Sequence, residues 1–243
     1  MPFQHGNVRL ELNDSGTVSF CIVTEPSLLV LVPAYNEERR IEPVLREYAG
    51  YFQEQYHGKF QLVVVLNGCR DNTLGVVERV AADCPSISAL NFPEAIGKGG
   101  ALIEGLKLAP TADLIGYVDA DGASPPQALH QLVKLTNQAD CVIGSRWLPG
   151  AVLHQAQPWL RRFTSRSFHV IVETLFWMHI KDTQCPCKVM RRGAVEKVHS
   201  SLRIADLAFF ELKLFGRPTV ADIVVLCCRL RALPRHLQLL RSY

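Results

Sequence analysis

Two carboxylates, Asp119 and Asp121, stand one residue apart where the apolar segment 114–118 ends. Successive side chains on an extended chain alternate between faces, so these two can point the same way. Two oxygen ligands on one side suit a hard divalent cation such as Mg²⁺ or Mn²⁺, which keeps its other positions for water and phosphate. On a surface loop the same pair would simply be solvated. The position at the end of a buried strand favours a metal site.

A glycine-rich stretch, Gly97-Lys98-Gly99-Gly100, is the second candidate. It lacks the earlier glycine and the following Ser or Thr of a Walker loop, and it is not a dinucleotide fingerprint. The stretch can begin a helix whose free N–H groups, together with the lysine, favour an anion. A tight loop that needs flexible residues explains it equally well at this point.

Basic residues gather after residue 144, at Arg146, Arg161, Arg162 and Arg166. On a helix, Arg161 and Ser165 would lie one turn apart on one face. Such a face can hold a phosphate through charge-assisted hydrogen bonds. Taken in isolation, these residues fit a solvated basic helix face better.

The elements that must position these residues alternate regularly along the chain. Continuous apolar runs typical of strands buried on both faces occur at 27–32 and 61–66, a weaker strand is predicted at 87–92, and further strands are predicted at 114–118 and 139–144. Helical spacing occurs at 37–55, 73–82, 99–108 and 126–137. This alternation predicts an α/β fold with a mostly parallel central sheet flanked by helices. Further predictions are helix at 159–180 and 191–200, and a loop or short strand at 182–190.

Polar clusters follow three of the predicted strands, at 33–37 (PAYNE), at 67–71 (NGCRD) and at 119–121 (DAD). Ligands of parallel α/β sheets bind beyond the carboxyl ends of the strands. We therefore expect the three clusters to converge on one edge of the sheet.

Composition narrows the class of protein. The chain has 243 residues, 48% hydrophobic and 20% charged, which is enough apolar material for a full core. A net charge of +3 is too small to indicate nucleic acid as the main partner. The eight cysteines have neither zinc-ribbon nor thioredoxin spacing, and the start of the chain has no apolar secretory core. We expect a cytoplasmic protein with reduced thiols and no structural zinc.

The chain is predicted to divide into a peripheral hairpin at 1–26, a main domain at 27–215 and a divergent basic tail at 216–243. The hairpin turn is expected at 13–16. No window reaches the roughly 18 apolar residues of a membrane span. The nearest candidate, 168–180, could be a buried helix or a surface that meets lipid.

Taken in order, these segments resemble the family 2 glycosyltransferases. They are most similar to the branch that makes polyprenyl-phosphate sugars, the dolichyl-phosphate or polyprenyl-phosphate glucosyltransferases and mannosyltransferases. The matching stretches are 32–38 (VPAYNEE), 97–101 (GKGGA), 119–123 (DADGA), 143–146 (IGSR) and 182–185 (DTQC), with Lys188 three residues later. Each stretch alone is a weak signal, but five in the right order with near-right spacing are specific.

The resemblance implies a GT-A fold, which is Rossmann-like and binds a nucleotide-sugar, and a metal-dependent hexosyltransferase activity. It implies that Asp119 and Asp121 hold Mg²⁺ or Mn²⁺ on the donor diphosphate. The other donor contacts would be Pro33, Ala34, Tyr35, Glu37, Asn67, Asp71 and Lys98. The acceptor phosphate would be held by Arg146, Arg161, Ser165, Gln184 and Lys188. Asp121 and Arg146 would act in catalysis, with Asp182 in a supporting position.

The implied reaction is inverting transfer of a hexose from UDP-glucose, or a similar donor such as GDP-mannose, to a polyprenyl or dolichyl phosphate. A lipid-phosphate acceptor implies peripheral contact with the cytoplasmic face of a membrane. Two stretches depart from the family pattern: Asn67 replaces an aspartate, and 209–212 (FFEL) lacks one. The alternatives are transfer to a soluble or saccharide acceptor, and an inactive nucleotide-sugar-binding protein.

Overall fold

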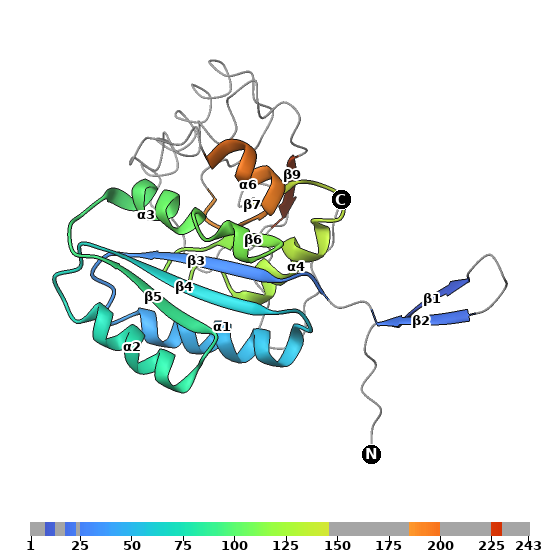
Figure 1. The fold of residues 1–243 in the computed structure, drawn as a ribbon. Helices are drawn as coiled ribbons and strands as arrows, with labels where there is room; N and C mark the ends of the chain where they lie inside the picture. Colours follow the sequence, from blue (N-terminus) through green and yellow to red (C-terminus); the bar gives the residue numbers. More distant parts are fainter. Residues whose placement is uncertain (1–7, 13–17, 23–24, 146–184, 200–224, 230–243) are drawn as a thin grey trace.

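A central β-sheet organises the computed structural model, which describes residues 8–12, 18–22, 25–145, 185–199 and 225–229 (Figure 1). Seven described strands form this sheet, in the order β5-β4-β3-β6-β8-β7-β9. The strands are β3 (Leu28–Ala34), β4 (Phe60–Asn67), β5 (Ile87–Phe92), β6 (Leu114–Tyr117), β7 (Cys141–Ser145), β8 (Lys188–Arg191) and β9 (Val225–Arg229). The predicted α/β class is confirmed, because helices alternate with these strands along the first part of the chain.

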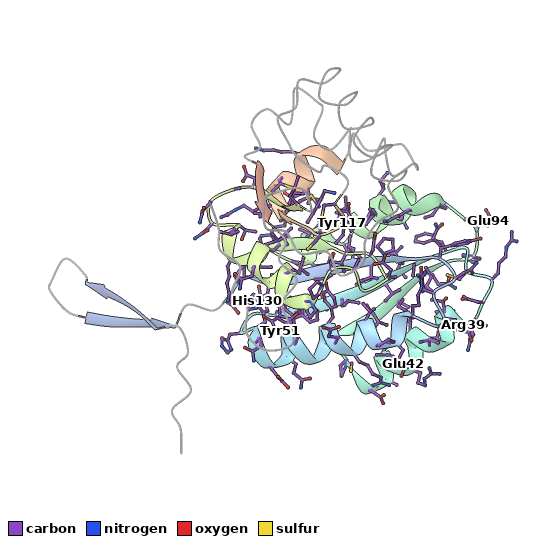
Figure 2. The ribbon with its side chains drawn as sticks, turned by 180° about the vertical axis from the view of Figure 1, so that it is seen from behind. Arg39, Glu42, Tyr51, Glu94, Tyr117 and His130 are labelled. Carbon is purple, nitrogen blue, oxygen red and sulfur yellow. The ribbon has the colours of Figure 1, made fainter. Side chains whose placement is uncertain are left out.

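Helices cover both faces of the sheet. They are α1 (Ile41–Gln55), α2 (Thr73–Asp83), α3 (Gly97–Leu106), α4 (Pro126–Leu135) and α6 (Arg192–His199), with a short 3₁₀ turn at Ala109–Thr111. In Figure 1, α1 and α2 lie below the sheet, and α3 and α6 lie above it. The α4 helix packs beside α1, where Tyr51 and His130 lie next to each other (Figure 2). The central strands β3 and β4 are thereby shielded from water on both faces, as their apolar sequences require.

The sheet is parallel except at β8. Strand β3 pairs in parallel with β4 and β6, β4 with β5, and β7 with β9. Strand β8 runs antiparallel between β6 and β7. The sequence indicated only a loop or short strand there. The position between two strands follows from long-range pairing, for which no local pattern exists.

Burial explains why the strands read as unbroken apolar runs. All seven residues of β3 and the last six of β4 are buried. On α1, the buried side chains include Ile41, Leu45 and Phe52, at the spacing of one helix face. Fully burying such a side chain contributes about 1.5–3 kcal/mol to stability. The buried residues of β3, β4 and the inner face of α1 therefore belong to the hydrophobic core.

The described strands nearest the N-terminus lie outside the central sheet, whereas the one nearest the C-terminus belongs to it. Near the N-terminus, β1 (Val8–Leu12) and β2 (Val18–Ile22) pair antiparallel in a sheet of their own, as expected for the hairpin. The predicted turn at 13–16 lies outside the described residues. Near the C-terminus, β9 pairs with β7 over its whole length. Residues 225–229 of the predicted tail at 216–243 thus lie in the central sheet, where β9 completes the hydrogen bonds of an otherwise open strand.

One predicted helix belongs to a part of the chain that the structure does not describe. The predicted helix at 159–180, with its apolar part at 168–180, lies outside the described residues. Among the helices that are described, none combines the length and the hydropathy that crossing a membrane requires.

Candidate active site

A pocket of about 210 Å³ opens beyond the carboxyl ends of β3, β4 and β6. The register aligns these ends, since Leu31 pairs with Tyr117 and Ala34 with Leu66. The three polar clusters therefore meet at one edge, as the sequence predicted. Eight residues expected at the donor site line the pocket: Pro33, Ala34, Tyr35, Glu37, Asn67, Lys98, Asp119 and Asp121.

The two carboxylates after β6 sit in different surroundings. Asp119 Oδ1 is shielded from solvent and, among the described residues, receives no hydrogen bond from any group other than the Lys98 ammonium. The Lys98 ammonium forms an ion pair with this oxygen, so it is compensated by charge. Asp121 Oδ1 accepts a hydrogen bond from the backbone N–H of Ala123 at 2.9 Å. Gly122 makes that turn with a φ of 75°, a left-handed conformation that glycine adopts without strain.

The loop after β3 presents an aromatic ring and a carboxylate. Tyr35 is half exposed at 50%. Asn36 has a φ of 54°, and its Oδ1 accepts the backbone N–H of Arg70 at 2.8 Å, which ties this loop to the loop after β4. The Glu37 carboxylate receives two hydrogen bonds from the Arg40 guanidinium, both at 2.9 Å. The loop is thus held by its own contacts, with the ring left accessible.

Asn67 supports the glycine-rich stretch. Its side chain is buried at the end of β4, and its Oδ1 accepts the backbone N–H of Ile96 at 2.6 Å. The helix α3 begins at the next residue, Gly97, which has a φ of 73°. The predicted helix start is observed, and the positive φ of Gly97 also fits the flexible residue of a tight loop, while the affinity of this helix start for an anion stays a prediction. Asn67 therefore fixes the backbone from which Lys98 reaches the pocket.

Asp71 was predicted to contact the donor but is not among the residues that line the pocket. Its carboxylate accepts the Thr73 hydroxyl at 2.5 Å and the backbone N–H of Glu38 at 3.1 Å. Burial opposes ionisation, but these hydrogen bonds outweigh it and hold the pKa of Asp71 below its usual value. In the structure, Asp71 therefore braces the loops after β3 and β4.

Lys188 was predicted to bind the acceptor, and the structure places it in the core. Its side chain is fully buried, and Nζ donates to the Tyr117 hydroxyl at 2.8 Å and to the carbonyl oxygen of Cys185 at 2.6 Å. The same nitrogen lies 4.9 Å from the centre of the Tyr117 ring. Lys188 does not line the donor pocket. Of the other predicted acceptor and catalytic residues, Asp121 lines the pocket, whereas Arg146, Arg161, Ser165, Asp182 and Gln184 lie outside the described residues.

Two further residues line the pocket, Arg40 and Ala120. Ala120 lies between the two aspartates, so the motif itself implies its position. Arg40 follows Glu37 by three residues, a spacing at which opposite charges meet on a helical turn. That spacing was the signal by which Arg40 could have been found.

The residues present fit a divalent cation. Asp119 contributes a shielded oxygen whose described partner is the Lys98 ammonium, and Asp121 lies in the same pocket. Within the described part of the chain, no three His, Cys, Asp or Glu side chains are grouped as a complete metal site. Two carboxylates suit an ion that takes its other ligands from water and a diphosphate.

The sheet, its flanking helices and the pocket at its carboxyl edge define the GT-A class of nucleotide-sugar-binding folds. A glucosyl-3-phosphoglycerate synthase from Mycobacterium tuberculosis, in complex with Mn²⁺ and UDP-glucose, superposes with a TM-score of 0.57. That match covers 87% of this chain and 72% of the other at 16% sequence identity, so it is a likeness of fold.

Sequence comparison identifies the family. Glycosyl transferase family 2 matches residues 29–199, and the chain belongs to this family. It is 39% identical over 176 residues to the dolichyl-phosphate beta-glucosyltransferase ALG5C of Trichomonas vaginalis, covering 68% of this chain and 51% of that protein. A second protein of that organism, ALG5A, is 35% identical over 202 residues, covering 76% and 60% respectively. The chain thus spans half to three fifths of the length of these two relatives.

Proposed function

We propose that this protein transfers a hexose from a nucleotide-sugar to a polyprenyl or dolichyl phosphate, with inversion at the anomeric carbon. UDP-glucose is the favoured donor. Membership of family 2 and the names of the two Trichomonas relatives support this choice of reaction.

The observation that carries the proposal is that aromatic, acidic and basic side chains line the same pocket. An accessible aromatic ring, Tyr35, shares it with the carboxylates of Asp119 and Asp121 and with the Lys98 ammonium. A nucleoside diphosphate needs this combination, because its base can stack on a ring and its phosphates need cations. We propose that the base lies against Tyr35 and the diphosphate near Lys98.

The carboxylates would act through a metal. When bound by Asp119 and Asp121, Mg²⁺ or Mn²⁺ would offset the charge that grows on the leaving diphosphate. The Mn²⁺ and UDP-glucose found with the mycobacterial synthase are consistent with this ligand set. In this chain, the hydrogen bond from Ala123 would keep Asp121 oriented.

The acceptor would be anionic before it reacts. The second pKa of a phosphate monoester is about 6, so near neutral pH it is already a nucleophile and needs orientation more than a general base. We propose that Arg146, Arg161, Ser165 and Gln184 hold it, with Asp182 supporting them. Lys188 would contribute indirectly, because it hydrogen-bonds the backbone of Cys185 next to Gln184.

A lipid acceptor would bring the protein to a membrane. We propose that it works at the cytoplasmic face, through peripheral contact. Flotation with vesicles that contain polyprenyl phosphate should recover the full chain at the top of a density gradient. Recovery that is equal without the lipid phosphate would count against this part of the proposal.

The decisive experiment follows radiolabelled sugar into product. The full chain in detergent with Mn²⁺ is given labelled UDP-glucose, UDP-galactose or GDP-mannose, with polyprenyl phosphate, phosphoglycerate or a free saccharide as acceptor. We expect lipid-soluble label from UDP-glucose and polyprenyl phosphate. Label only in a soluble product would support the rival acceptor class, and UDP binding without any transfer would support an inactive binding protein.

The acceptor residues can be tested in the same assay. Arg146→Ala should raise the KM for polyprenyl phosphate by at least about tenfold, as loss of a charged hydrogen bond predicts. Arg79→Ala, which removes an exposed arginine of α2, is the matched control. An unchanged KM in Arg146→Ala would remove Arg146 from the acceptor site.

A further inference from the structure

The pocket contains a cation of its own at the carboxylate predicted to hold the metal. Lys98 is the second residue of α3, and its ammonium pairs with Asp119 Oδ1. Both side chains are mostly shielded, at 34% and 25% exposure. Because no other described group donates a hydrogen bond to that oxygen, Lys98 compensates its negative charge.

A metal ion bound to Asp119 would need the same place. Divalent cations bind carboxylate oxygens at about 2.0–2.6 Å, so an ion on Oδ1 would lie against the Lys98 ammonium. Two cations on one oxygen repel each other strongly in a partly shielded site. The lysine therefore has to leave Oδ1 when the metal binds that oxygen.

The backbone around Lys98 indicates how it would leave. Asn67 Oδ1 accepts the backbone N–H of Ile96, and Gly99 and Gly100 are buried in the first turn of α3. The start of the helix is thus anchored, and exchange has to occur by rotation of the flexible lysine side chain. An ammonium that leaves one anion in a shielded pocket is stabilised by a second anion within reach.

We propose that Lys98 is a resident counter-ion of Asp119, which exchanges this carboxylate for the donor diphosphate when the divalent cation binds. This inference rests on the proposed use of a nucleoside diphosphate donor. Metal alone has to compete with the lysine, whereas metal and diphosphate together satisfy both Asp119 and Lys98. Lys98 thereby makes the binding of metal and nucleotide cooperative.

The test uses Lys98→Met, which removes the charge but keeps an unbranched side chain suited to a helix. Titration of Mn²⁺ into nucleotide-free protein, followed by the electron spin resonance of free Mn²⁺, measures the first half of the proposal. We expect Lys98→Met to bind Mn²⁺ alone about fivefold more tightly than wild type, near the lower end of typical coupling between ligands. Lys98→Arg keeps the charge and should bind Mn²⁺ like wild type.

Calorimetric titration of UDP at saturating Mn²⁺ measures the second half. Here Lys98→Met should bind UDP at least about tenfold more weakly, because a hydrogen bond to a charged group is lost. These opposite signs separate an exchange from simple damage to the site. Lys107→Met, which removes a lysine paired with Glu104 at the far end of α3, controls for net charge.

Each result of the Mn²⁺ and UDP titrations supports or overturns one part of the proposed exchange. If Lys98→Met binds Mn²⁺ no more tightly than wild type, or neither protein binds it, the exchange is overturned. If Mn²⁺ binding tightens but UDP binding is unchanged, the transfer of Lys98 to the diphosphate is overturned. If wild type binds Mn²⁺ but no UDP, the proposed donor is wrong, while the Mn²⁺ titration still tests the competition at Asp119.

Discussion

The charged side chains that line the pocket are largely paired with one another. Arg40 binds Glu37, and Lys98 pairs with Asp119. The lining therefore carries three carboxylates against two cations, an excess of one negative charge. A divalent cation reverses that sign and makes the pocket receptive to a diphosphate. At the scale of the residue, the free protein is arranged to bind metal and diphosphate together.

Asp121 tests the metal role most directly. Asp121→Asn keeps the size and the acceptor oxygen of the side chain but removes its charge. We expect kcat/KM for sugar transfer to fall on the order of a hundredfold, as for loss of one electrostatic contact to developing charge. Mn²⁺ affinity should fall as well, while the thermal unfolding midpoint stays near that of wild type. Full transfer activity in this variant would refute the metal role of Asp121.

Tyr35 tests where the base lies. Its ring is half exposed, so its removal should cost little stability. Tyr35→Ala should weaken UDP binding about tenfold, since stacking of a base on an aromatic ring contributes about 1–3 kcal/mol. Tyr35→Phe keeps the ring and should bind UDP nearly as well as wild type. If the two variants bind UDP equally well, the base does not stack on Tyr35.

At the scale of the element, hydrogen bonds between loops hold the pocket residues in register. Asn67 connects β4 to the start of α3, and Asp71 connects the loop after β4 to the loop after β3. The buried Tyr48 hydroxyl donates to the carbonyl oxygen of Ser124 at 2.7 Å, joining α1 to the turn after Asp121. Side chains behind the pocket thus determine the geometry of those that line it.

Asn67→Ala tests this coupling. The change leaves the Ile96 N–H without its acceptor and should lower the free energy of unfolding by about 1 kcal/mol. UDP affinity should fall too, because Lys98 loses its anchored backbone. Asn91→Ala, at an exposed position of β5, is the control. A stability loss with unchanged UDP affinity would show that Asn67 supports the fold without positioning Lys98.

Lys188 tests how far a buried side chain of β8 stabilises the sheet. Lys188→Ala removes the donor that Tyr117 and Cys185 share, and it leaves a cavity between β6 and β7. We expect a loss of about 3 kcal/mol in urea unfolding, the usual scale for breaking a buried polar contact of a charged group. Lys134→Ala, an exposed position on α4, should change little. Unchanged stability in Lys188→Ala would favour a role in acceptor binding alone.

At the scale of the whole molecule, a buried histidine links stability to pH. His130 is buried, with its Nδ1 at 3.0 Å from the Tyr51 hydroxyl and its Nε2 at 3.5 Å from a Glu25 carboxylate oxygen. Burial, with help from the nearby Lys134 charge, lowers the pKa of His130 despite the opposing effect of Glu25. The folded protein therefore keeps this ring neutral where an unfolded chain would protonate it.

The lowered pKa of His130 determines how the stability of the fold changes with pH. Because the folded pKa lies below the unfolded value of about 6.5, the unfolded chain takes up the proton first as pH falls. His130 thus makes the fold lose stability below about pH 6.5. His130→Gln should show a smaller loss of unfolding free energy between pH 7.5 and pH 5.5 than wild type, measured with urea. An equal loss in both proteins would mean that His130 does not control this window.

Local pattern accounts for much of the fold and for the donor side of the pocket. Runs such as 61–66 predict strands because a sheet covered on both faces needs apolar residues at every position. The DAD and PAYNE segments were placed at the pocket because parallel strands align their carboxyl ends. Arg40 was not predicted because it lies two residues beyond the family motif, which ends at Glu38.

What the sequence by itself determined is the order of elements, the edge at which ligands meet and the residue types available there. What only the tertiary structure decided is which of those residues touch. The pairing of Lys98 with Asp119, the burial of Lys188 beneath Tyr117 and the insertion of β8 between β6 and β7 join segments far apart in the chain. The physical reason is that periodicity and turn chemistry act over a few residues, whereas the partner of a buried charge depends on how the whole sheet packs.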